Sequence, residues 1–505
     1  MRAGRLLLSL MALLPAAGEA DPLVSWQRRL NLTLLEFRTG AGELEILNPS
    51  TFRFVRCRTK PCAGRNSGLA EPVPFQTVET SAAFEFKTRF LEIRVRKQDG
   101  GLQVKSRHAV ELLNEYVRPG PAPPGILLEH RSPAEERFYG LGARTDRELN
   151  LRGRAVATDR PLLISTLGYG LWFTASTHYQ FDLGKTAADR LTIQAPFPDR
   201  TEFFFHYGPT PKEILEENYA VVGSSFGPAL SHGENFTSAR GLPSYAKQPP
   251  PGMSFSDTLA WLAHASLSGT LVPALDRAAL ETPAADLLPM LYGAATSGFR
   301  RLLRPYLYTY LTEAKDRGIP LFRPMVMQYS KDASGAGRLD QFMLGDELLV
   351  ATGPEVYLPM GLWTDLRTGE LHKGKQGIPV AQSDRAAVFA RNGTIVPYER
   401  PDGVYELHYF PRLGAEFFFS EPGDSQPSQV HAGPAAGVLR LEIESRVARR
   451  YEWVVHHVSD ATSVEPAGVV KRYDAARRLL RIGAAEVPAM KGLIVNITLA
   501  EALEP

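Results

Sequence analysis

Cysteine and histidine side chains offer distinctive chemistry in this sequence, and their spacing limits what they can do. Cys57 and Cys62, in CRTKPC, are the only two cysteines among 505 residues. If the chain is exported to an oxidising compartment, this pair predicts a small loop closed by a disulfide, and two free thiols are the alternative. Two cysteines with no nearby histidine cannot complete a four-ligand zinc site, so no metal is expected.

His456 and His457 are adjacent in an alternating strand pattern, so they should face opposite sides and not act together on one substrate.

Carboxylates in the middle of the chain could act as general acids, bases or nucleophiles. Glu234, Asp257 and Asp276 are the candidates. Asp257 lies at the start of a segment with helical character, Ser256–Ser268, where the helix dipole favours an acid in the first turn for structural reasons alone. Whether two of these carboxylates form a catalytic pair depends on the elements that position them.

Those elements are most clearly indicated between residues 298 and 351. Apolar residues at helical spacing predict a helix over Gly298–Arg317. Gly318 is suited to cap that helix in the left-handed conformation, and Pro305 implies a kink or a late start. An apolar strand over Pro320–Val326, a loop and a second apolar strand should follow.

Several stretches in this order carry a family resemblance. The motifs are RFYGLGARTDRELNLRGRAVATD (Arg137–Asp159), LGYGLWFTASTHYQFDLG (Leu167–Gly184), YGPTPKEILEENYAVVG (Tyr207–Gly223), PYLYTYLTEA, GIPLFRPM and DQFMLGDELLVA (within 305–351), VYLPMGLWTDLRTGE (Val356–Glu370) and VFARNGTIVPY (Val388–Tyr398). Over roughly residues 130–400 the sequence resembles glycoside hydrolase family 31, the α-glucosidases and α-xylosidases. The resemblance implies a protein of carbohydrate metabolism.

The resemblance also implies a multidomain, β-rich fold with an α/β centre. We expect an N-terminal β-sandwich of galactose-mutarotase type over residues 21–222 and a truncated β/α barrel remnant over 223–340. A proximal C-terminal β-sandwich should span 341–400, and a distal one 401–505.

The length of the central segment predicts an incomplete barrel. An eight-stranded β/α barrel needs roughly 250 residues, whereas only about a hundred separate Gly223 from Met325. We therefore expect a partial layer with two to four helices. Its open sheet edges would need cover from loops, neighbouring domains or a second copy of the chain.

The catalytic residues of the family are missing or replaced. Its nucleophile is an aspartate in a Trp-x-Asp-Met-Asn-Glu context, and none of the five tryptophans is followed by such a motif. The segment Phe236–Arg277 resembles the part that holds the acid/base, and its alignment places Met253 at that aspartate. A thioether cannot exchange a proton near neutral pH. No catalytic residue is assigned, and the chain should be inactive or impaired as a retaining α-glucosidase.

The resemblance suggests some sugar contacts. Asp159, Arg240 and Asp276 correspond to positions where family members hold a substrate, although the neighbouring segments are shortened or lack the family's glycines. Arg323 and Asp340 match their motifs better. Buried arginines and acids in such strands are nevertheless more often paired structural charges, which is the interpretation adopted for these two.

The N-terminus and the charge predict the compartment and the class of partner. Residues 1–20 combine two arginines, an apolar run and small residues in a signal-peptide layout, so the protein should be secreted or periplasmic. No later segment is long and apolar enough to span a membrane. A net charge of +2 is too small an excess of positive charge to indicate binding to nucleic acid or to an anionic membrane. A neutral α-glucoside or α-xyloside suits it, and without a phosphate-cradling glycine loop no cofactor is expected.

Three functional hypotheses remain open. The first is a degenerate family member that binds carbohydrate without hydrolysing it. The second is an active α-glycosidase that uses Glu234, Asp257 or Asp276. The third is a structural or interaction protein whose incomplete barrel is filled by its own side chains or by another subunit.

Overall fold

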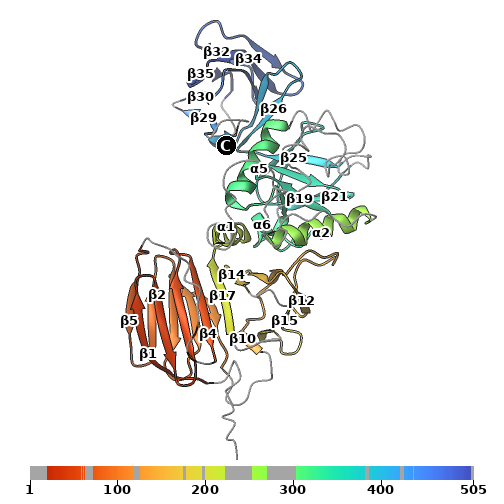
Figure 1. Cartoon of the computed structure of the whole chain (residues 1–505). Helices are drawn as coiled ribbons and strands as arrows, with labels where there is room; N and C mark the ends of the chain where they lie inside the picture. The colour runs from red at the N-terminus through yellow and green to blue at the C-terminus, as the bar shows by residue number, and fades with distance from the viewer. Residues whose placement is uncertain are drawn as a thin grey trace, which may run out of the picture. The chain divides into compact units, whose positions relative to one another are not determined.

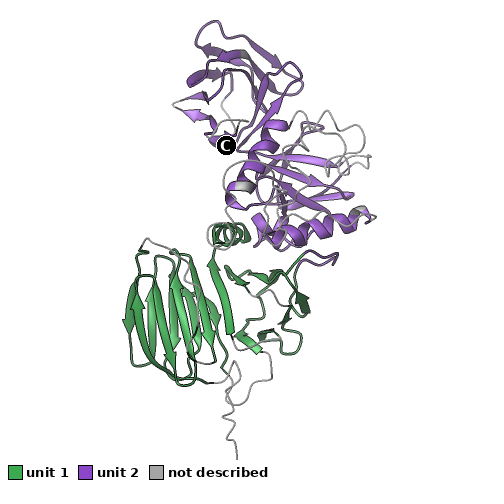
Figure 2. Cartoon of the chain, viewed as in Figure 1, with its two compact units in different colours: residues 1–142, 150–221 green, residues 143–149, 222–505 purple. Residues whose placement is uncertain are grey.

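The computed structural model divides the chain into two compact units, one formed by residues 1–142 with 150–221 and the other by 143–149 with 222–505 (Figure 2). The residues described are 20–58, 60, 62, 72–117, 126–174, 178–195, 200–221, 253–269, 303–380, 386–420, 426–435 and 437–501. Nearly all of the expected signal peptide and the larger part of the segment between 222 and 302 lie outside them.

The first unit consists of antiparallel sheets (Figure 1). Their orders are β1-β2-β3-β4-β17-β14-β13-β11, β10-β16-β15-β12 and β5-β6-β7-β8-β9. The bounds are Leu23–Arg29 (β1), Leu32–Phe37 (β2), Ala41–Ile46 (β3), Thr51–Cys57 (β4), Gln76–Glu79 (β5), Ala83–Lys87 (β6), Leu91–Arg96 (β7), Leu102–Ser106 (β8), Glu111–Asn114 (β9), Ile126–Arg131 (β10), Phe138–Gly140 (β11), Ala155–Thr158 (β12), Leu162–Ser165 (β13), Tyr169–Phe173 (β14), Tyr179–Leu183 (β15), Arg190–Gln194 (β16) and Arg200–Tyr207 (β17). An aromatic-rich core fills this unit, with Phe52 and Phe205 stacked at 5.0 Å between ring centroids.

The hairpin β7–β8 shows how the alternating pattern forms this unit. Every second residue of β7, beginning at Leu91, is buried, and the residues between them are half-buried. The turn contains Gly100 at φ +71°, and a Cβ there would lie 2.3 Å from the Asp21 carbonyl oxygen, so only glycine fits. The hairpin is one of the features that the sequence predicts.

Helix α1 (Pro211–Val221) ends the first unit and packs on β17 and β14. Its N-terminus is closed by Thr210, whose backbone N–H donates to Glu213 Oε2 at 3.0 Å. A proline at the first helical position and an acid in the first turn are typical start signals of a helix, and both are present here.

The second unit begins with helices and two antiparallel sheets. The helices are Phe255–Leu267 (α2), Arg304–Arg317 (α5) and Met325–Tyr329 (α6). A six-stranded sheet has the order β18-β19-β20-β25-β22-β23, and β21 pairs with β24. The bounds are Phe322–Pro324 (β18), Gln341–Leu344 (β19), Leu348–Ala351 (β20), Glu355–Leu358 (β21), Leu362–Asp365 (β22), Leu371–Lys373 (β23), Gln376–Pro379 (β24) and Ala387–Arg391 (β25).

Helix α5 confirms the predicted C-terminus and the late start. Gly318 adopts φ 70° and its N–H bonds the Ala314 carbonyl oxygen, while the helix begins only at Arg304, next to Pro305. The helix packs mainly against two strands of the distal part, Thr394–Glu399 (β26) and Ala415–Phe419 (β28). Tyr306 stacks on Phe417 of β28 at 5.8 Å between ring centroids.

The strand after α5 is shorter than predicted. It ends at Pro324, and the chain turns at once into the short helix α6, so the expected strand Pro320–Val326 is wrong at its end. The apolar run is ambiguous because Met325, Val326 and Met327 are buried just as well on a helix as on a strand.

Two five-stranded sheets form the distal part of the second unit, in the orders β26-β27-β31-β34-β33 and β28-β29-β30-β35-β32. The bounds are Thr394–Glu399 (β26), Tyr405–Phe410 (β27), Ala415–Phe419 (β28), Ser428–Ala435 (β29), Val438–Ser445 (β30), Arg449–Val455 (β31), Ala461–Glu465 (β32), Lys471–Asp474 (β33), Leu479–Val487 (β34) and Lys491–Leu499 (β35). Strand β26 precedes residue 400, where the sequence suggested the boundary, and pairs with β27.

The predicted class, a multidomain and mostly β protein, is confirmed. Between residues 222 and 340 the described part contains α2, α5, α6 and β18, and these residues form no ring of parallel strands. Strand β18 instead pairs antiparallel with β19. None of the helices in the described ranges is long and apolar enough to span a membrane.

Candidate functional site

The predicted sugar contacts are only partly described by the structure. Asp159 directly follows β12 in the first unit and its side chain is exposed. Arg240 and Asp276, together with the alternative carboxylate Glu234, lie outside the described residues. Their role as contacts stays a prediction.

The start of α2 shows what Asp257 does. Ser254 is the N-cap, and its hydroxyl accepts the Asp257 backbone N–H at 3.2 Å while it donates to Asp257 Oδ2 at 2.6 Å. Arg147 Nη2 donates to the other carboxylate oxygen, also at 2.6 Å. Asp257 is thus a capping and ion-paired residue of the first turn, as the sequence indicates. Met253, which the family resemblance places at the acid/base position, is half-buried directly before the cap.

The adjacent histidines contact different partners. Strand β31 ends before them, and His457 adopts φ 55°, so their separation does not come from strand alternation as expected. His456 Nε2 lies 3.0 Å from His408 Nδ1, and His457 Nε2 lies 2.8 Å from Thr364 Oγ1. Burial lowers the pKa of both His456 and His457, so both are neutral at neutral pH. They do not act on one substrate.

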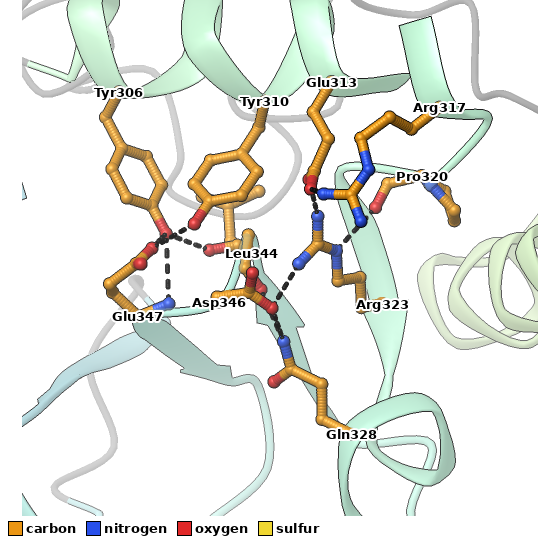
Figure 3. Close-up of polar contacts among 11 residues, drawn as sticks. Tyr306, Tyr310, Glu313, Arg317, Pro320, Arg323, Gln328, Leu344, Asp346 and Glu347 are labelled. Carbon is orange, nitrogen blue, oxygen red and sulfur yellow. Dashed lines mark hydrogen bonds and ion pairs between the residues drawn. The ribbon is translucent and has the colours of Figure 1, made fainter. Parts of the chain in front are cut away.

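The best-defined polar cluster surrounds Arg323, whose side chain is fully buried between α5 and the strand ends (Figure 3). Its guanidinium donates to Glu313, to Asp346 and, at 2.8 Å, to the Pro320 carbonyl oxygen. Burial opposes the charge, but the carboxylates of Asp346 and Glu313 raise the Arg323 pKa above its already high value. The structure thereby confirms that Arg323 is a paired structural charge.

Glu347 lies beside this cluster and has a different environment (Figure 3). Tyr310 donates to Glu347 Oε2 at 2.5 Å, and the Tyr306 hydroxyl lies 2.8 Å from the same oxygen and 2.6 Å from the Leu344 carbonyl oxygen. A carbonyl oxygen can only accept, so the single hydroxyl proton of Tyr306 is best used there. A proton on the Glu347 carboxyl would complete the second contact, with Glu347 as the donor.

The electrostatics agree with this proton count. Burial, followed by the neighbouring charge of Asp346, raises the pKa of Glu347, and the hydrogen bonds from the two tyrosines only partly oppose it. Burial also raises the pKa of Tyr306 and Tyr310, which therefore keep their protons. Burial therefore shifts Glu347 towards the neutral acid, and both tyrosine hydroxyls contact its Oε2 atom.

The remaining predicted residues are also paired. Asp340 receives two bonds from Arg338, at 2.9 and 2.8 Å, near the surface. Cys57 and Cys62 form a disulfide in the first unit. In the part of the chain that the structure describes, no group of three or more His, Cys, Asp or Glu side chains is arranged to hold a metal ion.

Sequence reasoning missed the pairing of Glu347 with Tyr306 and Tyr310. Two tyrosines four residues apart share one helix face, which is a visible signal. The acid that they bind is 41 residues from Tyr306 in sequence, and only the tertiary fold brings it to that face.

Comparisons with known proteins find similarity to glycosyl hydrolases. Residues 318–396 match the model of the glycosyl hydrolase family 31 C-terminal domain. A Flavobacterium johnsoniae GH31 dextranase complexed with glucose has a similar fold over 95% of this chain and all of that chain, with a TM-score of 0.73 and 14% identity. The chain thus contains a family 31 C-terminal domain, and over most of its length it shares the fold of solved GH31 structures.

Curated members of family 31 match over shorter stretches. Human neutral alpha-glucosidase AB is 42% identical over 111 residues, which is 20% of this chain and 12% of the human protein. Alpha-glucosidase 2 of Bacillus thermoamyloliquefaciens is 24% identical over 210 residues, 35% of this chain and 27% of that protein. The cycloalternan-forming enzyme of Listeria monocytogenes, solved with a pentasaccharide substrate, has a TM-score of 0.73 at 13% identity, over 95% of this chain and 77% of that one. At such identities the solved structures establish the fold alone.

Proposed function

We propose that this protein binds α-linked carbohydrate but does not hydrolyse it at an enzymatic rate. The observation that carries the proposal is the sequence of the catalytic centre. None of the five tryptophans precedes the family's nucleophile motif, and Met253 stands at the acid/base position. Hydrolysis with retention needs two carboxyl groups about 5 Å apart across the scissile bond. A chain without the nucleophile loses the covalent intermediate and most of the rate enhancement.

The contacts of Asp257 support the proposal and argue against the alternative of an active enzyme. Of the carboxylates considered for that role, Asp257 is the described one, and both of its oxygens are already engaged by Ser254 and Arg147. A general acid must have its carboxyl within hydrogen-bond reach of the leaving-group oxygen. Because both Asp257 oxygens are held by partners at the start of α2, Asp257 is poorly placed for that role.

The ligand class is inferred from the relatives. The dextranase of Flavobacterium johnsoniae was solved with glucose and, as a mutant, with isomaltotriose, and the Listeria monocytogenes enzyme with a pentasaccharide. α-Glucans are therefore the first ligands to test, followed by α-xylosides, because a GH31 alpha-xylosidase of Xanthomonas citri shares the fold with a TM-score of 0.63. We propose export from the cytoplasm as well, on the signal-like residues 1–20.

The hydrolysis test uses the mature chain with aryl α-glucoside and aryl α-xyloside. We expect no turnover above a matched blank. Turnover in the usual enzyme range, roughly 1–1000 per second, would overturn the proposal. In that case Asp257→Asn and Asp276→Asn would show which carboxylate is used.

The binding test separates a carbohydrate-binding protein from a structural one. Isothermal titration with isomaltotriose and maltose is expected to give saturable binding, with cellobiose, a β-linked glucose disaccharide, as the control for linkage. The absence of binding at millimolar concentration would leave the structural role as the better account.

A further inference from the structure

The hairpin β33–β34 in the distal part of the chain concentrates positive charge. It joins Lys471–Asp474 to Leu479–Val487 through a turn at 475–478. Five basic residues and a single acid, Asp474, occupy positions 471–481. The basic residues are Lys471, Arg472, Arg477, Arg478 and Arg481. The whole chain carries a net charge of only +2, so this hairpin is a local concentration and not a reflection of overall composition.

Only part of this charge is neutralised. Lys471 Nζ pairs with Asp460 at 2.9 Å, and Arg481 pairs with glutamates of β27 and β31. Arg472, Arg477 and Arg478 are exposed, and no hydrogen bond or ion pair of their guanidinium groups is formed with the described residues of the chain. We refer to these three residues as the arginine patch.

The placement of the patch works against the fold. Arg472 lies directly opposite Arg481 on the neighbouring strand, and like charges in that position are destabilising. Arg478 adopts φ 49°, a left-handed conformation that glycine or asparagine would adopt at lower cost. Neither feature is required for a hairpin turn, so the fold alone does not account for the arginines.

Protection of a sheet edge explains only one of them. Strand β33 is the last strand of its sheet, and charged residues on an edge strand prevent pairing with another chain. This accounts for Arg472 on the strand. It does not account for Arg477 and Arg478, which lie in the turn.

We propose that the arginine patch is a docking surface for an acidic polysaccharide whose sugar units carry carboxylates, a polyuronate. The guanidinium group offers parallel N–H donors that match a carboxylate, and three such groups on one hairpin fit a ligand with repeating anionic charge. A polysaccharide is favoured over nucleic acid because the positive charge is confined to this hairpin of a nearly neutral protein. The inference goes beyond the proposed function, which concerns neutral α-linked sugars.

The test compares two variants that remove the same charge from the mature chain. The patch variant carries Arg472→Gln, Arg477→Gln and Arg478→Gln. The control variant carries Arg107→Gln, Arg412→Gln and Arg450→Gln, which replace three scattered exposed arginines. Circular dichroism melting establishes that both are folded, and biolayer interferometry measures binding to immobilised polygalacturonate and to neutral dextran.

We expect the wild-type chain to bind polygalacturonate, with an affinity that falls as salt rises from 50 to 200 mM because the contacts are exposed. Because the patch variant loses three basic contacts to an anionic ligand, it should bind polygalacturonate at least about tenfold more weakly. The control variant should keep the wild-type affinity within about threefold, because isolated charges on an exposed surface contribute little.

Three results would overturn the inference: no binding by the wild-type chain, equal loss in the two variants, or tighter patch-dependent binding to DNA or to phosphatidylserine vesicles than to polygalacturonate. Titration of the patch variant with isomaltotriose tests whether loss of the arginine patch also affects binding of the neutral α-linked sugar of the proposed function. Unchanged isomaltotriose binding beside lost polygalacturonate binding would show two independent sites.

Discussion

Replacement of Arg323 by methionine should destabilise the second unit strongly. The substitution keeps much of the side-chain volume but leaves the carboxylates of Glu313 and Asp346 without the cation that now bonds both. Removing one partner of a buried ion pair costs about 3–5 kcal/mol. The cost should be near the lower end, about 3 kcal/mol, because the Asp346 side chain is 30% exposed and Glu313 keeps Arg317 at 2.8 Å.

A matched control is present in the same unit. Arg338 also bonds two carboxylates, Asp340 at 2.8 Å and Glu355 at 3.3 Å, but those acids are 40% and 57% exposed. Arg338→Met should therefore cost less than about 1 kcal/mol, the usual range for pairs in contact with water. The difference between the two substitutions isolates burial, because the number of ion pairs lost is the same.

Urea unfolding followed by circular dichroism gives the free energies, and hydrogen exchange of peptides from α5 and β19 shows whether the loss is local. A third variant, Arg323→Met with Glu313→Gln and Asp346→Asn, removes the unpaired charges and should recover most of the loss. Equal costs for Arg323→Met and Arg338→Met would refute the reasoning. So would a triple variant that is no more stable than Arg323→Met.

Three other substitutions give independent checks. Glu347→Gln should leave the urea midpoint at pH 8 unchanged or higher, since the raised pKa means that the fold prefers the neutral acid. The stability that Glu347 contributes is complete below the carboxyl pKa of the unfolded chain, about 4.3, and is lost as pH rises through the pKa of Glu347 in the folded protein. A urea midpoint that falls on substitution would contradict the raised pKa. Leu307→Ala, at a fully buried position of α5, should cost about 2–5 kcal/mol by calorimetry, and a near-neutral result would mean that the helix is not packed. Burial raises the pKa of Glu406, but hydrogen bonds from His408 and Arg481 outweigh it and lower the pKa to about 2. Glu406→Gln should therefore destabilise the protein at pH 7, and the loss of stability should shrink as pH falls from about 4.3 towards 2. A loss that stays constant over that pH range in melting experiments would exclude the linkage.

Local signals allowed much of the fold to be predicted from the sequence. The end of α5 follows from Gly318, and the hairpin β7–β8 follows from alternation around a glycine turn, because each depends on neighbours within a few residues. The switch from strand to helix at Met325 could not be read in the same way. A buried apolar run has no exposed face to reveal its period.

The polar clusters illustrate a different limit. Burial of Arg323 was predictable as a structural charge from its strand context, but its acceptors lie 10 and 23 residues away. Asp346 and Glu347 are adjacent in sequence, yet Asp346 bonds Arg323 and Glu347 contacts the two tyrosines. The sequence does not show which of the two acids pairs with the arginine. Only the tertiary contacts distinguish the partner of the arginine from the acid whose pKa burial raises.

Strand β18 shows how an open sheet edge can be protected without a partner chain. It is the outermost strand of a six-stranded sheet, where an open edge would invite pairing with another chain. It is only three residues long, it ends in Pro324, which has no N–H to donate, and helix α2 packs against it. These three features are the usual means of blocking an edge. A second copy of the chain, one of the three kinds of cover considered from the sequence, is therefore not required at this strand.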